Sequence, residues 1–365
     1  MKPSASEHTR RGFLLGSAAG ATALIAQSAG AMAGPASSAA ADPLDCAEFH
    51  AGIDGSNNLS DILDYNGLLA AKTGDTGSYS YTGNKISLRR YAPNDYGYNV
   101  STYLTIAGIG SYLGHGCQAL AVHGDTAFIF YDTGYCRTVD LVAKTLISSF
   151  QLPSGVAGAN NNCGQANFGS EYHSVGDDFP VLYLSSYKED ACYVLAMTTS
   201  SASLVQTIRL SADGTTAMDS GSFFVDNEND KMIVKMPATD VNGKAYNYFK
   251  VFDLPALDLG ASVLLLDEKK CDEFYVRVLK GNVAAASNVW GGGFAMNGKL
   301  YVCAGSSGST SSFLVVDYEK HKILSEVRWG SSLITSRTQQ HCAKYNDMLL
   351  LDLTGADYLP AVEFV

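Results

Sequence analysis

The sequence has few charged residues, and basic side chains are the minority among them. Charged residues make up 17% of the 365-residue chain, and 25 Lys and Arg against 36 Asp and Glu give a net charge of −11. A surface that follows a phosphate backbone needs clustered Lys and Arg to release counterions. We therefore expect no nucleic-acid partner.

Long apolar runs are also missing. No stretch of about 18 or more strongly apolar residues follows the N-terminus, which argues against membrane-spanning helices. The chain instead contains 36 Gly and 21 Tyr, and 46% of it is apolar. This composition favours one large β-rich unit with a sizeable core over several small helical domains.

The N-terminus has the layout of a bacterial export signal. Thr9-Arg10-Arg11-Gly12-Phe13-Leu14-Leu15 precedes an Ala- and Gly-rich apolar run that ends in Ala31-Met32-Ala33, and the paired arginines resemble the twin-arginine class. We predict a signal peptide over residues 1–33, cleaved after Ala33. Ala39-Ala40-Ala41 is a second candidate cleavage site, and a retained membrane anchor is the alternative.

Cleavage after Ala33 leaves 22 basic and 35 acidic residues, so the mature chain carries a charge of −13. We expect it outside the cytoplasmic membrane, in the periplasm or the extracellular space. The resemblance to the twin-arginine class implies transport of a folded protein, which permits a cofactor without requiring one; we predict none.

A pattern of about fifty residues recurs along the chain, as in repeat architectures. Each copy has a polar turn, a strongly apolar strand and a further strand. Asx and Gly suit such turns because they tolerate positive φ. The turns lie 53, 52, 68 and 49 residues apart, at Gly124-Asp125, Asp177-Asp178, Asn229-Asp230, Asn297-Gly298 and Asn346-Asp347.

The strand after each turn is rich in β-forming residues and too short for a helix. The five strands are expected over 127–131, 181–184, 232–236, 300–303 and 348–351. A third strand ends near an acidic residue in four copies, at Asp140, Asp253, Asp317 and Glu363, whereas the second copy reads Tyr193-Val194-Leu195-Ala196-Met197. Fourth strands are expected over 146–150, 204–208 and 323–327.

Four antiparallel strands per unit, repeated with few helical segments, resemble the blades of a β-propeller. The resemblance covers residues 98–365. The last copy stops in its third strand, and Ser101–Ala107 lies where a fourth strand should be, just before the first complete copy. We therefore predict that this N-terminal segment closes the last blade.

The number of blades is the open part of this prediction. Five copies are clear, and residues 34–97 form an N-terminal extension or a degenerate sixth blade. Gly74-Asp75 fits the period, but the strand Ser78-Tyr79-Ser80-Tyr81 lacks the apolar content of the others. The long spacing between Asn229 and Asn297 predicts an insertion around Asp267–Asn288, with Lys269-Lys270-Cys271-Asp272-Glu273 on a surface loop.

The innermost strand of each blade lines the central channel, so candidate functional residues are sought just before each turn. Blades one, two and five are polar there, and ring closure makes these three blades neighbours. Amides and an aromatic face suit a polyhydroxylated ligand. The ligand-binding candidates are Gln118, Gln165, Asn167, Trp290, Gln339 and Gln340. Alternatively, these groups simply satisfy backbone groups in a solvated channel.

Three functions are consistent with these residues. The leading hypothesis is an exported protein that binds a glycan or another polar extracellular ligand at the channel mouth. The second is a carbohydrate-active lyase or hydrolase at the same mouth, with His115, Glu171, Tyr172 and His341 as candidate acid/base residues. The third is a protein-interaction platform. A glycosidase needs two carboxylates flanking one bond, and only Glu171, Asp219 and Asp226 qualify.

No metal site is predicted. His341 and Cys342 are adjacent on a strand and would point to opposite faces, so they could not readily share one ion with His115 and Cys117. The eight cysteines permit disulfides in an exported protein. Cys117 with Cys163 is the more reachable pair, whereas Cys303 is expected to pack in the core.

Overall fold

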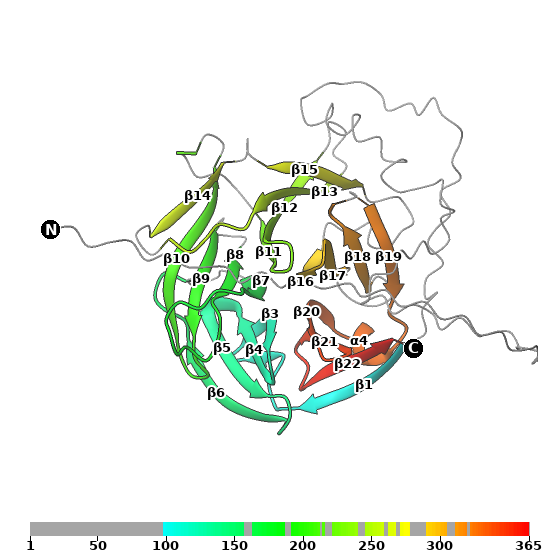
Figure 1. Ribbon diagram of the computed structural model, residues 1–365. Coiled ribbons are helices and arrows are strands. Elements are labelled where there is room, and N and C mark those ends of the chain that lie inside the picture. Colours follow the sequence, from blue (N-terminus) through cyan, green and yellow to red (C-terminus); the bar gives the residue numbers. More distant parts are fainter. Residues whose placement is uncertain are drawn as a thin grey trace, which may run out of the picture. The chain divides into compact units, whose positions relative to one another are not determined.

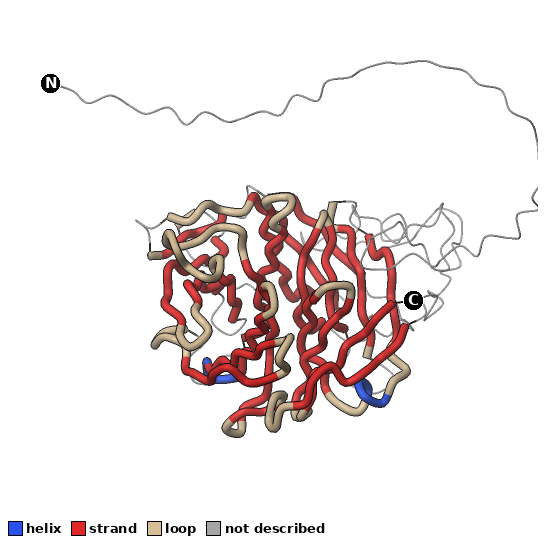
Figure 2. The backbone as a smooth tube through the Cα atoms, turned by 60° about the horizontal axis from the view of Figure 1, so that its bottom comes forward, coloured by secondary structure: helices blue, strands red, loops and turns tan. Residues whose placement is uncertain are grey.

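The computed structural model describes residues 98–156, 163–186, 191–211, 214–215, 221–239, 245–258, 262–267, 271–277, 290–304, 311–319 and 322–364. Almost all regular structure in these ranges is β-strand, arranged as five small sheets in a ring (Figure 1). The protein is therefore a five-bladed β-propeller, as predicted. Loops gather at the two ends of the strands, where successive strands are joined (Figure 2).

Each sheet is one blade, and its strands are given below in the order in which they pair across the sheet. Blade 1 contains β2 (Ser111–Tyr112), β3 (His115–His123), β4 (Thr126–Tyr131), β5 (Tyr135–Asp140) and β6 (Thr145–Gln151). Blade 2 contains β7 (Cys163–Phe168), β8 (Leu182–Ser186), β9 (Ala191–Met197), β10 (Ala202–Ser211) and β14 (Val263–Asp267). Blade 3 contains β11 (Ser222–Asp226), β12 (Lys231–Thr239), β13 (Ala245–Asp253) and β15 (Asp272–Arg277).

The last two blades follow the same plan. Blade 4 contains β16 (Trp290–Met296), β17 (Lys299–Ala304), β18 (Ser312–Asp317) and β19 (Lys322–Arg328). Blade 5 contains β20 (Thr338–Tyr345), β21 (Met348–Thr354), β22 (Tyr358–Phe364) and β1 (Tyr98–Thr105). The short helices η1 (Asp132–Gly134) and α4 (Ser332–Thr335) lie in connections. Neither these nor any other described helix is long and apolar enough to cross a membrane.

The N-terminal strand closes the ring. β1 pairs antiparallel with β22, with Tyr98 opposite Phe364 and Thr105 opposite Tyr358. The predicted closure is confirmed, with the strand starting and ending slightly earlier than expected. Because β20 of blade 5 lies directly beside β3 of blade 1, the ring closes with five blades, and the six-bladed alternative is wrong. Residues 1–97, including the predicted signal peptide and Gly74-Asp75, lie outside the described residues.

Part of the long spacing before blade 4 is occupied by β-strands. Val263–Asp267 pairs in parallel with β10 as a fifth strand of blade 2, and the chain then returns to form the outer strand of blade 3. Asp272 and Glu273 therefore begin strand β15, so the expectation of a loop there was wrong. It failed for these two residues because they pair with β13, whereas residues 268–270 and 278–289 of the predicted insertion lie outside the described residues.

The core lies in layers between blades, where the apolar faces of neighbouring sheets meet. Cys117 packs in the layer between blades 5 and 1, whereas Cys163 packs in the layer between blades 1 and 2. The two thiols are free, and the suggested pairing was wrong because they face different layers. Cys303 lies in the layer between blades 4 and 5, which confirms its expected packing role.

Candidate site at the entry end of the axis

A bulge recurs on four of the five inner strands, which are β3, β7, β11, β16 and β20. In β3, β7, β16 and β20 the pairing with the next strand shifts and leaves one extra residue on the inner strand. Bulges re-aim side chains and are frequent beside functional sites. The extra residue is Gln118 in β3, Gly164 in β7 and Gln340 in β20, and it falls within Gly291–Gly292 in β16.

The glycines allow the bulges to approach one another closely. A Cβ atom on Gly292 would lie 1.9 Å from Cδ2 of His341 and 2.7 Å from the carbonyl oxygen of Gly164, and one on Gly291 would lie 2.5 Å from the carbonyl oxygen of Gln340. Blades 2, 4 and 5 therefore nearly meet at the axis. Gln118 and Gln340, on adjacent blades, are the two bulge residues with long polar side chains.

The end of the axis where the inner strands begin is called the entry end. At this end Gln340 Nε2 donates to Thr354 Oγ1 at 3.0 Å, and Thr354 Oγ1 donates to the carbonyl oxygen of Cys117 at 3.4 Å. A Cβ on Gly116 would lie 3.1 Å from Thr354 Cγ2, 3.7 Å from Gln118 Nε2 and 3.8 Å from Asp132 Oδ2. These side chains thus converge on Gly116. We call His115, Gln118, Asp132, Gln340 and Thr354 the entry cluster; each is partly exposed.

Aromatic rings border the entry cluster. β2 and β3 form a tight hairpin whose turn, Leu113-Gly114, has positive φ at both residues. The His115 ring stacks on Tyr135 with centroids 6.0 Å apart, and Tyr112 meets Tyr135 edge-on at 5.7 Å. All three rings are partly exposed, so amide, carboxylate, imidazole and phenol groups occur together at this end.

A second polar group, which we call the axial plug, fills the axis next to the bulges. It consists of Gln165, Asn167, the backbone of Gly293 and His341. Gly293 N–H donates to Gln165 Oε1 at 2.9 Å, and Gln165 Nε2 donates to Asn167 Oδ1 at 2.7 Å and to the Gly293 carbonyl oxygen. Asn167 Nδ2 also donates to that oxygen at 3.2 Å. Gln165 is fully buried, and these bonds join the non-adjacent blades 2 and 4.

His341 extends the axial plug from blade 5. Its Nε2 accepts from the backbone N–H of Ala166 in blade 2 at 3.4 Å, and its side chain is fully buried. Burial lowers the pKa of His341 to about 3, so the ring is neutral at physiological pH. The predicted acid/base candidate His341 thus serves as a packed hydrogen-bond acceptor in this conformation.

Two further binding candidates have other positions. The buried Gln339 accepts from Trp329 Nε1 at 2.8 Å and donates to the carbonyl oxygen of Ser312 at 2.7 Å, so its amide is engaged between blades 4 and 5. Trp290 begins β16, and its side chain lies outside what the structure describes. Of the five ligand-binding candidates whose side chains the structure describes, Gln118 and Gln340 are the partly exposed pair at the entry end.

Glu171 and Tyr172 lie beyond the last residue of β7, Phe168, and hence at the opposite, exit end of the axis. Both are exposed, and Glu171 Oε2 accepts from the Leu257 N–H at 3.2 Å. Counting back from the turn does not find equivalent residues in blade 2, because a long loop separates β7 from β8. The structure therefore does not bring Glu171 and Tyr172 together with His115.

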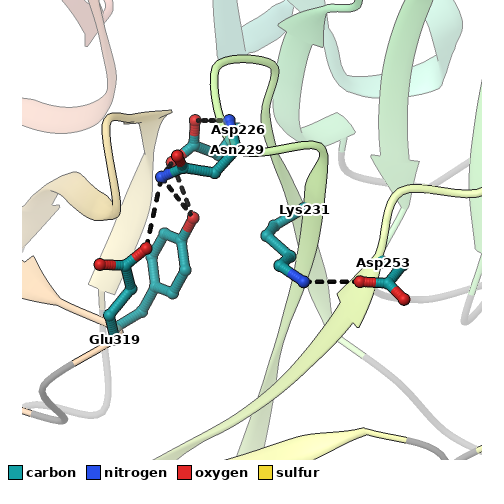
Figure 3. A network of polar contacts seen from close by, with 6 residues as sticks. Asp226, Asn229, Lys231, Asp253 and Glu319 are labelled. Atoms are coloured by element: carbon teal, nitrogen blue, oxygen red, sulfur yellow. Dashed lines mark hydrogen bonds and ion pairs between the residues drawn. The ribbon is translucent and has the colours of Figure 1, made fainter.

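Asp226 also lies at the exit end, where it joins blades 3 and 4. Its Oδ2 accepts from the N–H of Gly298 and the hydroxyl of Tyr318, each at 2.7 Å. Asn229 lies between the carboxylates of Asp226 and Glu319 (Figure 3). Burial, followed by the hydrogen bond with Asp226, raises the pKa of Glu228. Asp226 is therefore held in an inter-blade network, and Asp219 lies outside the described residues.

Sequence reasoning missed Asp132, Thr354 and Asp352. Asp132 follows β4 of blade 1, Thr354 is the last residue of β21 of blade 5, and both belong to the entry cluster. Asp352 lies fully buried in β21, where burial raises its pKa to about 8. The available signal was the sequence Leu349-Leu350-Leu351-Asp352-Leu353, in which an acidic residue interrupts a core strand.

Within the described ranges, no group of three or more His, Cys, Asp and Glu side chains is arranged to hold a metal ion. His341 faces the axis, whereas the Cys342 side chain packs in the layer between blades 4 and 5. The two side chains thus leave the strand in different directions, as strand alternation requires.

Comparisons with known proteins do not assign a family to this chain. No protein-family model matches the chain, and no curated protein matches it. Among solved structures, Myxococcus xanthus glutaminyl cyclase is 13% identical over 74% of this chain and 97% of that one, with a TM-score of 0.44. Chaetomium thermophilum Raptor is 12% identical over 72% and 29% of the respective chains, with a TM-score of 0.36. Neither similarity bears on the chemistry of the entry cluster.

Proposed function

We propose that this protein is an exported binding protein that recognises a neutral glycan at the entry cluster. The observation that carries the proposal is the bulge position on the inner strands. Adjacent blades 5 and 1 place Gln340 and Gln118 there, whereas blade 2 has Gly164 and blade 4 has Gly291–Gly292. Two neighbouring blades thus carry a primary amide at the bulge, and the blades on either side of this pair carry glycine there.

The chemistry of the entry cluster fits a polyhydroxylated ligand. An amide offers two donors and an acceptor with two lone pairs, and sugar hydroxyls need partners of both kinds. The rings of Tyr112, His115 and Tyr135 supply flat apolar area beside polar tips. A chain with a net charge of −11 favours neutral ligands over polyanions.

A binding function is preferred over catalysis because the acid/base candidates are dispersed. His115 lies at the entry end, His341 in the axial plug, and Glu171 and Tyr172 at the exit end. A glycosidase needs two carboxyl groups roughly 5–10 Å apart across one bond. Of the described carboxyl groups, Asp132 belongs to the entry cluster, whereas Asp226 is engaged between blades 3 and 4 and Glu171 is at the exit end, so the cluster lacks the second carboxyl group.

Glycan-array binding by the wild-type protein, with an assay for new reducing ends and unsaturated sugars, tests this function. We expect binding to a neutral glycan without product formation. The double variant Gln118→Ala/Gln340→Ala should bind at least about tenfold more weakly, since each lost hydrogen bond contributes about 1 kcal/mol. The control is Gln151→Ala, at an exposed glutamine on outer strand β6.

Three results would contradict the proposal: no neutral glycan bound, unchanged binding by the double variant, or turnover of the bound glycan. Turnover would favour the enzyme hypothesis, and binding of a protein in place of a glycan would favour the interaction platform. The export part of the proposal depends on residues 1–33. We expect N-terminal sequencing of protein recovered outside the cytoplasm to begin at Gly34; a cytoplasmic protein that retains Met1 or Lys2 would contradict it.

A further inference from the structure

Asp352 is a carboxyl group buried between two blades. It pairs across β20 and β21 with His341. Strand alternation places its side chain on the same face as Leu350, which packs in the layer between blades 5 and 1. The residue has no exposed surface, and neither carboxyl oxygen accepts a hydrogen bond of ordinary geometry from any described group.

The groups around Asp352 offer little compensation for a negative charge. Cys117 of β3 faces it with its thiol, and the hydroxyl of Tyr131 from β4 donates to the carbonyl oxygen of Ile109. Arg137 of β5 donates to the carbonyl oxygens of Ala107 and Gly108, at 3.2 and 2.9 Å. From other strands, the ionisable neighbours are His341 and Cys303, both buried.

The Asp352 carboxyl and the neighbouring Cys117 thiol both retain their protons at neutral pH. Burial raises the pKa of Asp352 to about 8. Burial, and then the neighbouring Asp352 carboxyl, raises the pKa of the Cys117 thiol. An ionised carboxylate in this position would be desolvated without a paired cation, which is strongly unfavourable. Ionisation therefore requires blades 5 and 1 to separate locally so that water can enter.

The packed layer between β21 of blade 5 and β3 of blade 1, which we call the seam, lies next to the entry cluster. Asp352 is two residues before Thr354, which accepts from Gln340 and donates to the carbonyl oxygen of Cys117. Cys117 in turn immediately precedes Gln118. A shift of β21 relative to β3 would consequently change the distance between Gln340 and Gln118.

We infer that a proton on Asp352 keeps the seam between blades 5 and 1 closed, and that losing this proton opens the seam and weakens ligand binding at the entry cluster. The first half concerns the fold alone, and the second half rests on the proposed function. Asp352 is a positioning residue in this scheme, because it acts through Thr354 and Cys117 and does not touch the ligand.

The direction of the pH effect follows from linkage. The folded protein keeps the Asp352 proton up to about pH 8, whereas the unfolded chain loses it near about pH 4. The folded state therefore binds more protons between these values, and its stability falls as pH rises through this window. His341 contributes the opposite slope only below about pH 6.5, where the unfolded imidazole binds a proton.

The test compares urea unfolding of the wild type and Asp352→Asn, which keeps the shape and removes the titration. Between about pH 6.5 and about pH 9, the unfolding equilibrium constant of the wild type should rise at least about tenfold more than that of the variant. If Asp352 had a purely structural role, the unfolding equilibrium constants of the two proteins would change with pH in the same way. Parallel pH profiles would overturn the inference.

If Asp352→Asn does not fold, infrared spectroscopy of the wild type replaces it. We expect the band of a protonated carboxyl at neutral pH, lost between about pH 7 and about pH 9; absence of this band would overturn the inference. Glycan affinity then tests the second half: it should fall severalfold across the same range in the wild type only. If the protein binds a glycan but the two unfolding profiles are parallel in pH, the inference about Asp352 is wrong and the proposed function stands. If the profiles diverge but no glycan binds, the proposed function and the second half of the inference are wrong and the first half stands.

Discussion

The axial plug and the entry cluster contain the same types of residue but differ in burial and in role. Gln165 and Gln118 lie on the inner strands of neighbouring blades, yet Gln165 is fully buried and its amide joins blade 2 to the backbone of blade 4. Gln118 is partly exposed at a bulge. A buried amide left unpaired is costly, whereas a partly exposed one can exchange water for a ligand. The position of a glutamine relative to the bulge, more than its residue type, therefore decides whether its amide stabilises the fold or stays available to a ligand.

The largest effect on stability is expected from Gly292→Ala, which places a methyl group where His341 and the Gly164 carbonyl already lie. Overpacking of this severity should lower the free energy of unfolding by at least about 3 kcal/mol. Urea denaturation measures it. The control Gly330→Ala, whose Cβ would only touch the Tyr98 hydroxyl at 3.5 Å, should cost less than about 0.5 kcal/mol. Equal costs would show that the axis is not tightly packed.

Gln165→Leu should have the next largest effect. It removes the acceptor of the Gly293 N–H, the Gln165 donor to Asn167 Oδ1 and one of the two donors to the Gly293 carbonyl oxygen, which should cost about 2 kcal/mol in total. The matched change Gln118→Leu in the entry cluster should alter the free energy of unfolding by less than about 0.5 kcal/mol. Similar losses in the two variants would erase the distinction between axial plug and entry cluster.

Acid should act on the axial plug through His341. Its pKa is lowered to about 3 in the folded protein, so the unfolded chain binds the extra proton between about pH 6.5 and about pH 3. As pH falls below about 6.5, the wild type should lose about 1.4 kcal/mol per pH unit relative to His341→Gln. Asp352 titrates in both proteins, so its contribution cancels in the difference. A constant difference across pH would mean that His341 is solvated.

The smallest effect on stability belongs to the entry cluster. Gln118→Ala/Gln340→Ala removes the side-chain hydrogen bond between Gln340 and Thr354, and should change the free energy of unfolding by less than about 1 kcal/mol. Chemical denaturation of this variant checks that its loss of glycan binding is not unfolding. A loss comparable to that of Gln165→Leu would place the two glutamines in the structural network.

Local patterns in the sequence were sufficient to predict the propeller. The Asx and Gly turns adopt the expected positive φ at Gly124, Asp230, Asn297 and Asn346, and the missing strand of the last blade comes from β1. Blade 2 was the exception, because a long loop replaces its hairpin turn. Counting from turns consequently assigned Glu171 to a strand that ends at Phe168.

The site was less predictable than the fold because burial at the axis depends on three blades at once. Gln165 and Gln340 look alike in sequence, and only the strand pairing shows that one fills the axis and the other occupies a bulge. Asp352 was identifiable as an acid within a leucine-rich strand. Its lack of a cationic partner was not, because it depends on which side chains of blade 1 face it. Tertiary packing therefore decides which polar residues remain available.

Side-chain amide NMR during glycan titration tests the division between entry cluster and axial plug most directly. The NH₂ signals, assigned with the single alanine variants of Gln118, Gln340 and Asn167, should respond selectively to a glycan that binds. We expect the signals of Gln118 and Gln340 to shift while that of Asn167 in the axial plug stays fixed. A shift of Asn167 with unmoved Gln118 and Gln340 would contradict the account.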